Sequence, residues 1–347
     1  MQNKLFALAR PEIVAMSAYR SARSEAATGS IWLDANENPW NDGQYNRYPD
    51  PQPYSLVANL ATVYGVKPDQ ILVTRGSDEG IDLLLRLFCR AGQDEIMICP
   101  PTYGMYKVAA TIQGASVVEI PLLKEQNFSL NSANILEVWR PSIKLVFLCS
   151  PNNPTGNLLA VQDILSICKK LDKKSIIIVD EAYIEFSSSD SLVNYLNDYP
   201  NLVILRTLSK AYGLAGIRCG VTIANPGIIQ LLKKIIAPYP IPKPIVSIAS
   251  KQLSLNGIES QIKIIYQERD RLFFFLSNLP FVKKVWKSDA NFLLFEVENS
   301  KMIMDACISN GIVLRDRSSE YNLNNCIRVT IGDPNENTFL MEVLSRV

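Results

Sequence analysis

TLSKAYGLAGIR, residues 207–218, combines one lysine with two hydroxyl groups and an arginine. Lys210 stands beside Thr207 and Ser209, and Arg218 follows an apolar run that contains two glycines. Hydroxyl groups and arginines bind phosphate, and a lysine amine condenses with an aldehyde. The stretch therefore indicates a site for a phosphorylated aldehyde. A solvated surface position is the default for a single lysine, but the neighbouring phosphate-binding groups make that alternative the weaker one.

A second stretch, SIIIVD at residues 175–180, is an apolar run that ends at Asp180. Pyridoxal phosphate (PLP) is a phosphorylated aldehyde whose pyridine nitrogen needs a partner, usually Asp. An ionised Asp180 would keep that nitrogen protonated, so that the ring can act as an electron sink. Lys210 would also move a proton between Cα and C4′, which requires a neutral amine with a lowered pKa. An acidic residue at the end of a strand is often structural, but beside Lys210 it predicts a PLP enzyme.

Apolar runs alternate with amphipathic stretches from about residue 71 to residue 225. Helical patterns such as Asp78–Arg90 and Val161–Leu171 lie between the runs. This alternation predicts an α/β fold with a mostly parallel central sheet flanked by helices. Ligands of such sheets bind beyond the carboxyl ends of the strands, where Asp180, Thr207 and the loop after Cys149 fall. We expect strands at Gln70–Thr74, Glu95–Cys99, Ser116–Ile120, Lys144–Cys149, Ser175–Asp180, Leu202–Arg206 and Cys219–Ala224.

A proline-rich segment, APYPIPKP at residues 237–244, cannot form an interior strand or helix. A chain of 347 residues is long enough for two domains. We expect an N-terminal arm at residues 1–30, a large PLP-binding domain at 31–240 and a smaller α+β C-terminal domain at 241–347. In the last of these, Ile258–Leu279 predicts a long helix, and Ala290–Glu298 and Cys326–Ile331 predict strands.

Two further motifs are candidates for binding the cofactor's phosphate and ring. GSDE at residues 76–79 follows a predicted strand and opens a predicted helix, whose first N–H groups would bind phosphate at Ser77 and Asp78. A plain helix cap made by Ser77 is the alternative. Tyr103, in PPTYG at residues 100–104, could stack on the cofactor ring, or be an ordinary core or loop aromatic.

The loop SPNNPTG at residues 150–156 follows the strand that ends at Cys149. The amide of Asn153 would donate a hydrogen bond to the 3′ oxygen of PLP. Tyr183, in DEAY at residues 180–183, would donate to the same oxygen. Two prolines and a glycine also suit a simple rigid turn. With Lys210 and Asp180, Tyr183 completes the predicted catalytic set.

Composition excludes several classes of function. The chain has no histidine, which removes histidine-based triads and His-ligated metal sites, and no metal site is expected. A net charge of +1 gives no overall field to attract nucleic acid or an anionic membrane, and no apolar run is long enough to span a bilayer. Seven scattered cysteines without a Cys-x-x-Cys pair indicate core residues in a reduced setting. The N-terminal residues lack the pattern of a signal peptide, so a cytoplasmic protein is expected.

Taken together, the chain resembles the fold-type I PLP-dependent aminotransferases over essentially its whole length. More narrowly, it is similar to the histidinol-phosphate aminotransferases, and each motif behind that likeness is short but their order along one chain is specific. The motifs are YRSAR at residues 19–23, DANENP at 34–39, NRYPDPQP at 46–53, RGSDEG at 75–80, LRDR at 314–317 and IRVTIG at 327–332.

The resemblance implies a homodimer with active sites at the subunit interface. Tyr48 would reach the PLP phosphate of the partner subunit, and Tyr19 would close over the substrate. Arg328 matches an arginine that binds the substrate α-carboxylate in related enzymes. Arg315 and Arg328 together would grip a substrate phosphate, with Asn153 also counted among the substrate-binding residues. The phosphate cup for PLP would consist of Ser77, Asp78, Thr207, Ser209 and Arg218.

The implied reaction is a ping-pong transamination. Glutamate gives up its amino group and leaves as 2-oxoglutarate, and imidazole-acetol phosphate is then aminated to L-histidinol phosphate. Two alternatives of the same fold are an aromatic amino-acid aminotransferase, with Arg328 on a carboxylate, and a phosphothreonine decarboxylase. A PLP-binding transcriptional regulator is disfavoured, because only about thirty residues precede the expected fold and the chain is not basic.

Overall fold

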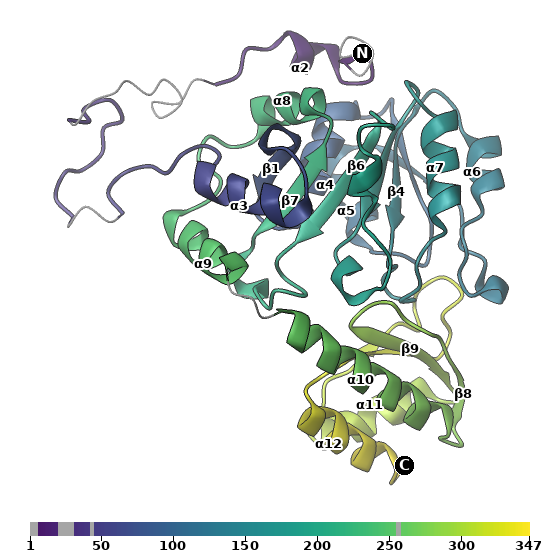
Figure 1. The fold of residues 1–347 in the computed structure, drawn as a ribbon. Helices are drawn as coiled ribbons and strands as arrows, with labels where there is room; N and C mark the ends of the chain where they lie inside the picture. Colours follow the sequence, from purple (N-terminus) through teal and green to yellow (C-terminus); the bar gives the residue numbers. More distant parts are fainter. Residues whose placement is uncertain (1–5, 20–30, 42–44, 255–257) are drawn as a thin grey trace.

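A computed structural model describes residues 6–19, 31–41, 45–254 and 258–347. Its strands form two sheets, one of seven strands in the order β1-β7-β6-β5-β4-β2-β3 and one of four in the order β10-β11-β9-β8. Figure 1 shows the larger sheet in the upper body of the molecule and the smaller one below it, near the C-terminus.

The larger sheet confirms the expected mostly parallel arrangement. β2 to β6 run parallel to one another, and β7 is antiparallel to both β1 and β6. Each expected strand is present, with ends within about one residue of those expected. The strands are β1 Ile71–Thr74, β2 Glu95–Ile98, β3 Ser116–Glu119, β4 Ile143–Cys149, β5 Ile176–Asp180, β6 Leu202–Thr207 and β7 Gly220–Ala224.

Helices cover both faces of this sheet, which explains why its central strands are apolar throughout. In β5, Ile177 and Val179 join the core on one face, and Ile176 and Ile178 join the core on the other. The first face packs against α3 Tyr54–Tyr64, α6 Ser132–Val138, α7 Val161–Lys170 and α9 Lys243–Ser254. The second packs against α2 Pro11–Ala15, α4 Ser77–Phe88, α5 Met105–Gln113 and α8 Pro226–Ile235. Short 3₁₀ turns lie at Pro68–Gln70, Lys124–Gln126, Ile184–Phe186, Leu192–Tyr195 and Ala215–Ile217.

The smaller sheet is antiparallel and has its own core. Its strands are β8 Val282–Val285, β9 Phe292–Val297, β10 Arg315–Asp316 and β11 Cys326–Thr330. Buried side chains of β9 and β11 pack with those of α10 Ile258–Ser277, α11 Ser300–Ser309 and α12 Pro334–Leu344. The long helix and the two strands expected in this region are therefore confirmed.

The proline-rich segment separates α8 from α9. α9 packs against α3 of the larger unit, whereas α10 packs on the smaller sheet. The boundary expected at residue 240 stays a prediction, and this packing favours a division after α9. In the expected arm, α2 lies on α8, where Lys234 Nζ donates to the Val14 carbonyl at 2.8 Å; residues 20–30 lie outside the described part of the chain.

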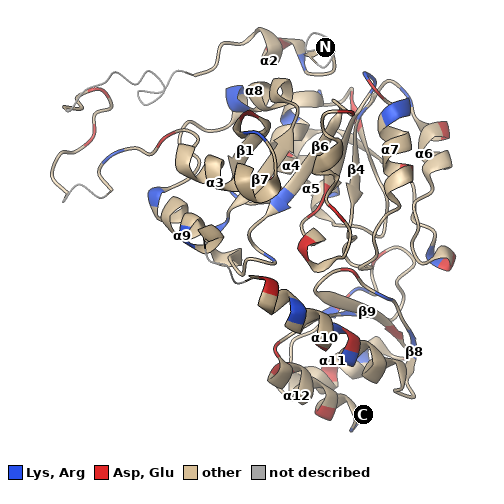
Figure 2. Cartoon of the chain, viewed as in Figure 1, with Lys and Arg blue, Asp and Glu red and all other residues tan. Residues whose placement is uncertain are grey.

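Acidic and basic residues are interspersed along the elements (Figure 2), in keeping with the net charge of +1. Within the described residues, no helix is long and apolar enough to cross a membrane. All seven cysteines are buried free thiols, as expected of core residues.

Candidate active site

A cavity of about 690 Å³ lies where the carboxyl ends of β4, β5 and β6 face the smaller sheet. Most of the predicted site residues meet there. The cavity is lined from the larger unit by Ser77, Asp78, Tyr103, Asn153, Asp180, Tyr183, Thr207, Ser209, Lys210 and Arg218, and from the smaller one by Arg315, Arg317, Glu320 and Arg328.

Asp180 is buried at the end of β5 and is held by two hydrogen bonds. The Tyr106 hydroxyl donates to its Oδ2 at 2.7 Å, and the Ala182 N–H donates to its Oδ1 at 3.1 Å. Burial raises the pKa of this carboxyl to about 6, although both hydrogen bonds pull the pKa down. A cation bound beside Asp180 would therefore stabilise the ionised carboxylate and offset its loss of hydration.

Strand alternation decides which side chains accompany Asp180. Because side chains alternate between faces, Asp180 follows Ile176 and Ile178 toward α4 and α5, and Thr207 follows Val203 and Leu205 to the same face. Arg206 points to the opposite face, where it is buried. There it forms ion pairs with Glu181 at 3.3 Å and Glu185 at 2.8 Å, which tie the ends of β5 and β6 together.

Lys210 follows β6 and lines the cavity above this edge. Its Nζ lies 5.5 Å from the centroid of the Tyr183 ring. Lys210 is exposed in the open cavity, yet partial desolvation by the surrounding walls lowers the pKa of its amine. The positive charge of Arg328 lowers the pKa further, while Asp180 and Asp78 act in the opposite direction. The net effect favours the neutral amine that proton transfer requires.

The start of α4 forms a backbone cradle beside Lys210. Gly76 is its N-cap, with φ 80° and no side chain to occupy the site, so the alternative of a cap made by Ser77 is wrong. A Cβ on Gly220 would lie 2.3 Å from the carbonyl carbon of Gly76 and 2.4 Å from the amide nitrogen of Ser77. β7 therefore packs backbone to backbone against the start of α4.

Arg218 closes the same cradle. A Cβ on Gly76 would lie 2.8 Å from Arg218 Nη2, and that nitrogen is 3.4 Å from Asp78 Oδ2. The Tyr103 hydroxyl donates to Asp78 Oδ1 at 3.0 Å. Helix N–H groups, an arginine and two hydroxyl residues, Thr207 and Ser209, thus converge beside the lysine.

Asn153 and Tyr183 are neighbours on the other side of Lys210. Asn153 Nδ2 donates to the Tyr183 hydroxyl at 3.4 Å, and Arg328 donates to Asn153 Oδ1. The Tyr183 ring packs edge-on against Phe292, with centroids 5.1 Å apart. The loop after β4 thereby connects the larger sheet to the arginines of the smaller one.

Sequence reasoning missed three residues of this cavity region. Tyr106 bonds Asp180, but its place one turn after PPTYG gives no sign of that contact. Arg317 and Glu320 line the cavity and form an ion pair of 2.7 Å. Arg317 could have been found, since it lies two positions after Arg315 and so on the same face of an extended strand.

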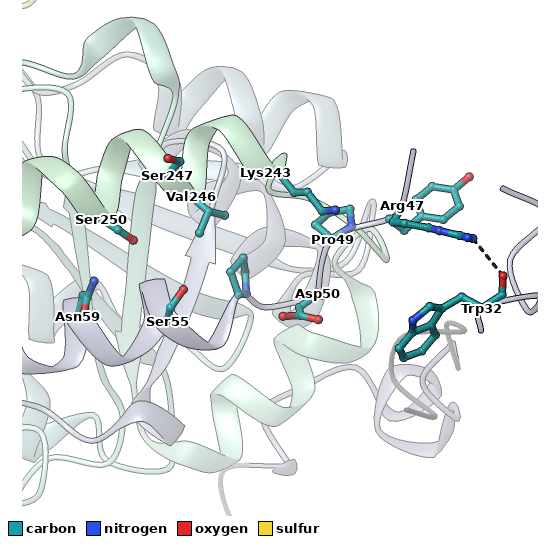
Figure 3. Close-up of a pocket in the computed structure, with 12 residues that line it drawn as sticks. Trp32, Arg47, Pro49, Asp50, Ser55, Asn59, Lys243, Val246, Ser247 and Ser250 are labelled. Carbon is teal, nitrogen blue, oxygen red and sulfur yellow. Dashed lines mark hydrogen bonds between the residues drawn. The ribbon is translucent and has the colours of Figure 1, made fainter. Parts of the chain in front are cut away.

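Two predicted site residues do not line this cavity. Tyr19 is 74% exposed, and Tyr48 stacks on Tyr239 with ring centroids 4.4 Å apart. Tyr48 belongs instead to a separate cavity of about 670 Å³ between α3, α9 and the segment before α3 (Figure 3). There Arg47 donates to the Trp32 carbonyl at 3.1 Å.

The family model for class I and II aminotransferases matches residues 19–344, nearly the whole chain. The chain belongs to this family. Class I and II aminotransferases depend on PLP, so the chain is a PLP-dependent aminotransferase, as the sequence predicts.

Individual relatives point the same way. The chain is 46% identical to the histidinol-phosphate aminotransferase of Francisella philomiragia, covering 98% of this chain and 95% of that one. It is 44% identical to histidinol-phosphate aminotransferase 2 of Idiomarina loihiensis, over 97% of each. The fold matches the crystal structure of the Clostridium acetobutylicum histidinol-phosphate aminotransferase with a TM-score of 0.79 and 29% identity, covering 86% of this chain and 90% of that one. The Sinorhizobium meliloti enzyme, crystallised with pyridoxal-5'-phosphate, matches with a TM-score of 0.78 and 26% identity, over 86% and 83%. The predicted fold-type I architecture is thus confirmed.

The residues around the cavity fit PLP on structural grounds. The cradle has no room for a Cβ at Gly220, and Gly76 adopts φ 80°, as a close backbone site for phosphate requires. Asp180 offers a buried carboxylate of raised pKa for the protonated pyridine nitrogen, and Lys210 offers an amine of lowered pKa. The described residues therefore include groups that fit the phosphate, the pyridine nitrogen and the aldehyde of PLP.

Proposed function

We propose that this aminotransferase transfers an amino group between L-glutamate and imidazole-acetol phosphate, forming L-histidinol phosphate in histidine biosynthesis. The observation that carries the proposal is the pair formed by Arg315 and Arg328, which lie opposite one another in the β10–β11 register and line the cavity of Lys210. Two guanidinium groups suit a phosphate dianion, because each can bind two oxygens. The curated relatives named above carry the same activity in their names.

The cofactor would be held by the larger unit. Backbone N–H groups at Ser77 and Asp78, the hydroxyls of Thr207 and Ser209, and Arg218 would bind its phosphate. Asp180 would pair with the pyridine nitrogen, and Tyr103 would lie against the ring. Bound PLP supplies an electron sink for the carbanion at the substrate Cα.

The proton transfer would fall to Lys210. Its neutral amine would take the proton from Cα of the amino donor and return one at C4′, and the lowering of its pKa shifts the amine toward that neutral form. Asn153 and Tyr183 would donate to the 3′ oxygen from adjacent positions, as their mutual hydrogen bond of 3.4 Å supports. Tyr183, whose ring lies 5.5 Å from Lys210 Nζ, would thereby help to position the cofactor beside Lys210.

Glutamate and histidinol phosphate must use one site in turn. Arg328 would bind the α-carboxylate of glutamate, and Arg315 and Arg328 together would bind the substrate phosphate. Asn153, which already accepts a hydrogen bond from Arg328, would orient that guanidinium toward either anion. Tyr19 would close over the substrate from the arm.

We also propose a cytoplasmic homodimer in which Tyr48 reaches the cofactor phosphate of the partner subunit. Tyr48 lies outside the cavity of its own Lys210, and the segment before α3 extends away from the body (Figure 1). That segment exposes large apolar side chains, which are typical of a surface covered by another chain. They are Ile31, Leu33, Trp40, Tyr45 and Tyr48, and Tyr54 at the start of α3 is exposed as well.

Mixed dimers test this arrangement. Lys210→Ala and Tyr48→Ala subunits, each weak or inactive alone, should regain activity when co-expressed, because one site then has both an intact Lys210 and an intact Tyr48. Absence of any gain, with mixed dimers present by mass, would place Tyr48 in its own subunit's site or outside the site.

The function itself is tested by a half-reaction on the PLP-loaded protein without keto acid. L-histidinol phosphate should change the cofactor absorbance rapidly, and phenylalanine much more slowly. Conversion by phenylalanine alone would move the enzyme to aromatic amino-acid metabolism. Release of carbon dioxide from phosphothreonine, with no keto acid consumed, would instead indicate a decarboxylase.

A further inference from the structure

A third arginine, Arg317, faces the cavity beside the two arginines used in the proposed function. Arg315 and Arg317 are two positions apart and leave the same face of the strand. Arg315 lies opposite Arg328, and the N–H of Arg317 donates to the Cys326 carbonyl at 2.9 Å, which continues the pairing past β10. Three guanidinium groups thus line one wall of the cavity.

Arg317 is held inward rather than solvated. Its side chain is 12% exposed, and its Nη2 lies 2.7 Å from Glu320 Oε1. The N–H of Glu320 donates to the Arg317 carbonyl at 3.0 Å, so the two residues share one tight turn. Arg317 Nε and Glu320 Oε2 are buried, and neither has a hydrogen-bond partner among the described residues. A buried donor without an acceptor is costly, so Glu320 alone does not satisfy the hydrogen-bonding capacity of this guanidinium.

The charges of this wall match a dianion. Three guanidinium groups and the carboxylate of Glu320 give this wall a formal charge of +2, which balances the charge of −2 on a fully ionised phosphate monoester. Burial lowers the pKa of Arg317, and the neighbouring Arg328 and Arg315 lower it further, which reports their mutual repulsion. A phosphate dianion relieves that repulsion more than the single negative charge of a carboxylate does.

We propose that Arg317 is a third ligand of the substrate phosphate and sets the preference for phosphorylated substrates over glutamate. This inference rests on the proposed function, because it assigns the phosphate-binding group of that same site.

The test compares half-reactions of the PLP-loaded wild type, Arg317→Gln and Arg317→Lys. Loss of a charged hydrogen-bond donor should lower kcat/KM for L-histidinol phosphate by about 10- to 100-fold in Arg317→Gln. The loss with glutamate should stay below about threefold, as expected for a residue away from the α-carboxylate. The kcat/KM of Arg317→Lys should fall between those of the wild type and Arg317→Gln, because lysine keeps the positive charge but cannot bind two phosphate oxygens as a guanidinium does.

A second readout does not depend on turnover. Inorganic phosphate should raise the melting temperature of the PLP-loaded wild type, and Arg317→Gln should reduce that rise. The matched control is Arg271→Gln, which removes an arginine of the smaller unit that also pairs with a glutamate three residues away, at 3.0 Å, but does not line the cavity. The control should behave as the wild type in both measurements.

The outcomes separate this inference from the proposed function. The proposed role of Arg317 is wrong if the wild type converts histidinol phosphate and Arg317→Gln keeps both that activity and the phosphate effect on the melting temperature. The role is also wrong if Arg317→Gln loses as much activity with glutamate as with histidinol phosphate. If the wild type does not convert histidinol phosphate but Arg317→Gln still reduces the phosphate effect, the phosphate contact stands and the proposed function falls. If both fail, both are overturned.

Discussion

The two walls of the active-site cavity differ in how deeply their side chains are buried. On the larger sheet, Asp180 and Thr207 are 3% and 4% exposed and sit at the ends of fully buried strands. On the smaller sheet, Arg315 lies in an exposed two-residue strand, and Arg328 is only partly buried. Asp180 owes its raised pKa to burial, whereas recognition of two different anions needs charges that can reach the ligand. A substitution of Lys210 or Asp180 in the first wall should affect all substrates alike, and one of Arg315 or Arg317 in the second should separate them.

The largest effect is expected for Lys210→Ala. The variant lacks the amine that moves the proton at Cα, so turnover should be abolished with glutamate and with histidinol phosphate alike. Half-reactions with each donor measure the loss, and borohydride reduction should no longer fix the cofactor to the protein. Lys301→Ala, at an exposed position of α11, is the control. Retained transamination would remove Lys210 from its proposed role.

Asp180→Asn should lower the activity with both donors by about 10²- to 10³-fold, as removal of a preorganised charge typically does. Because the loss arises on the cofactor, its size should be the same for glutamate and for histidinol phosphate. Substrate-selective loss would contradict the separation between the two walls.

The same substitution should change how the stability of the cofactor-free protein depends on pH. The pKa of Asp180 is raised from 3.8 to about 6, so the folded protein binds this proton more tightly than the unfolded chain does. That stabilisation is complete below the unfolded pKa and is lost as pH rises through the folded pKa. Between pH about 4 and about 7, the free energy of unfolding of the wild type should fall relative to Asp180→Asn by on the order of 3 kcal/mol. Urea titrations at a series of pH values measure this difference, and parallel curves would show that Asp180 does not titrate in this range.

Arg315→Gln should have a smaller and selective effect. Loss of one of the phosphate-binding forks should lower kcat/KM for histidinol phosphate by about tenfold or more, and that for glutamate by only a few-fold. Steady-state kinetics with both donors measure the ratio. Equal losses would mean that Arg315 acts on the fold or on the cofactor instead of on the substrate phosphate.

The smallest effect is expected for Tyr103→Phe. The change keeps the ring and removes the 3.0 Å hydrogen bond to Asp78, a loss of about 1 kcal/mol. The dissociation constant of PLP should rise by at most about fivefold, because no more than that loss can fall on cofactor binding, and the relative rates of the two donors should be unchanged. A changed donor preference would show that this part of the first wall also takes part in substrate selection.

Much of this architecture could be predicted from local patterns. Apolar runs such as Ser175–Asp180 gave the strands to within about one residue, since burial on both faces requires an unbroken apolar sequence. The parallel arrangement also follows from the alternation of strands and helices, so the meeting of Asp180, Thr207 and Asn153 at one edge was predictable. Tyr106 was not, because its bond to Asp180 joins residues 74 positions apart across the packing of α5 on the sheet.

The sequence by itself determined the lysine with its hydroxyl and arginine neighbours and the positions of the strands along the chain, because each depends on residues close together along the chain. The tertiary structure decided the pKa values of these groups and the residues that surround them. Burial raises the pKa of Asp180, the close approach of Gly220 to Ser77 shapes the cradle, and pairing of β10 with β11 brings Arg315 beside Arg328. The physical reason is that desolvation, backbone clearance and strand register depend on what packs against a residue, and that is fixed only when the chain folds.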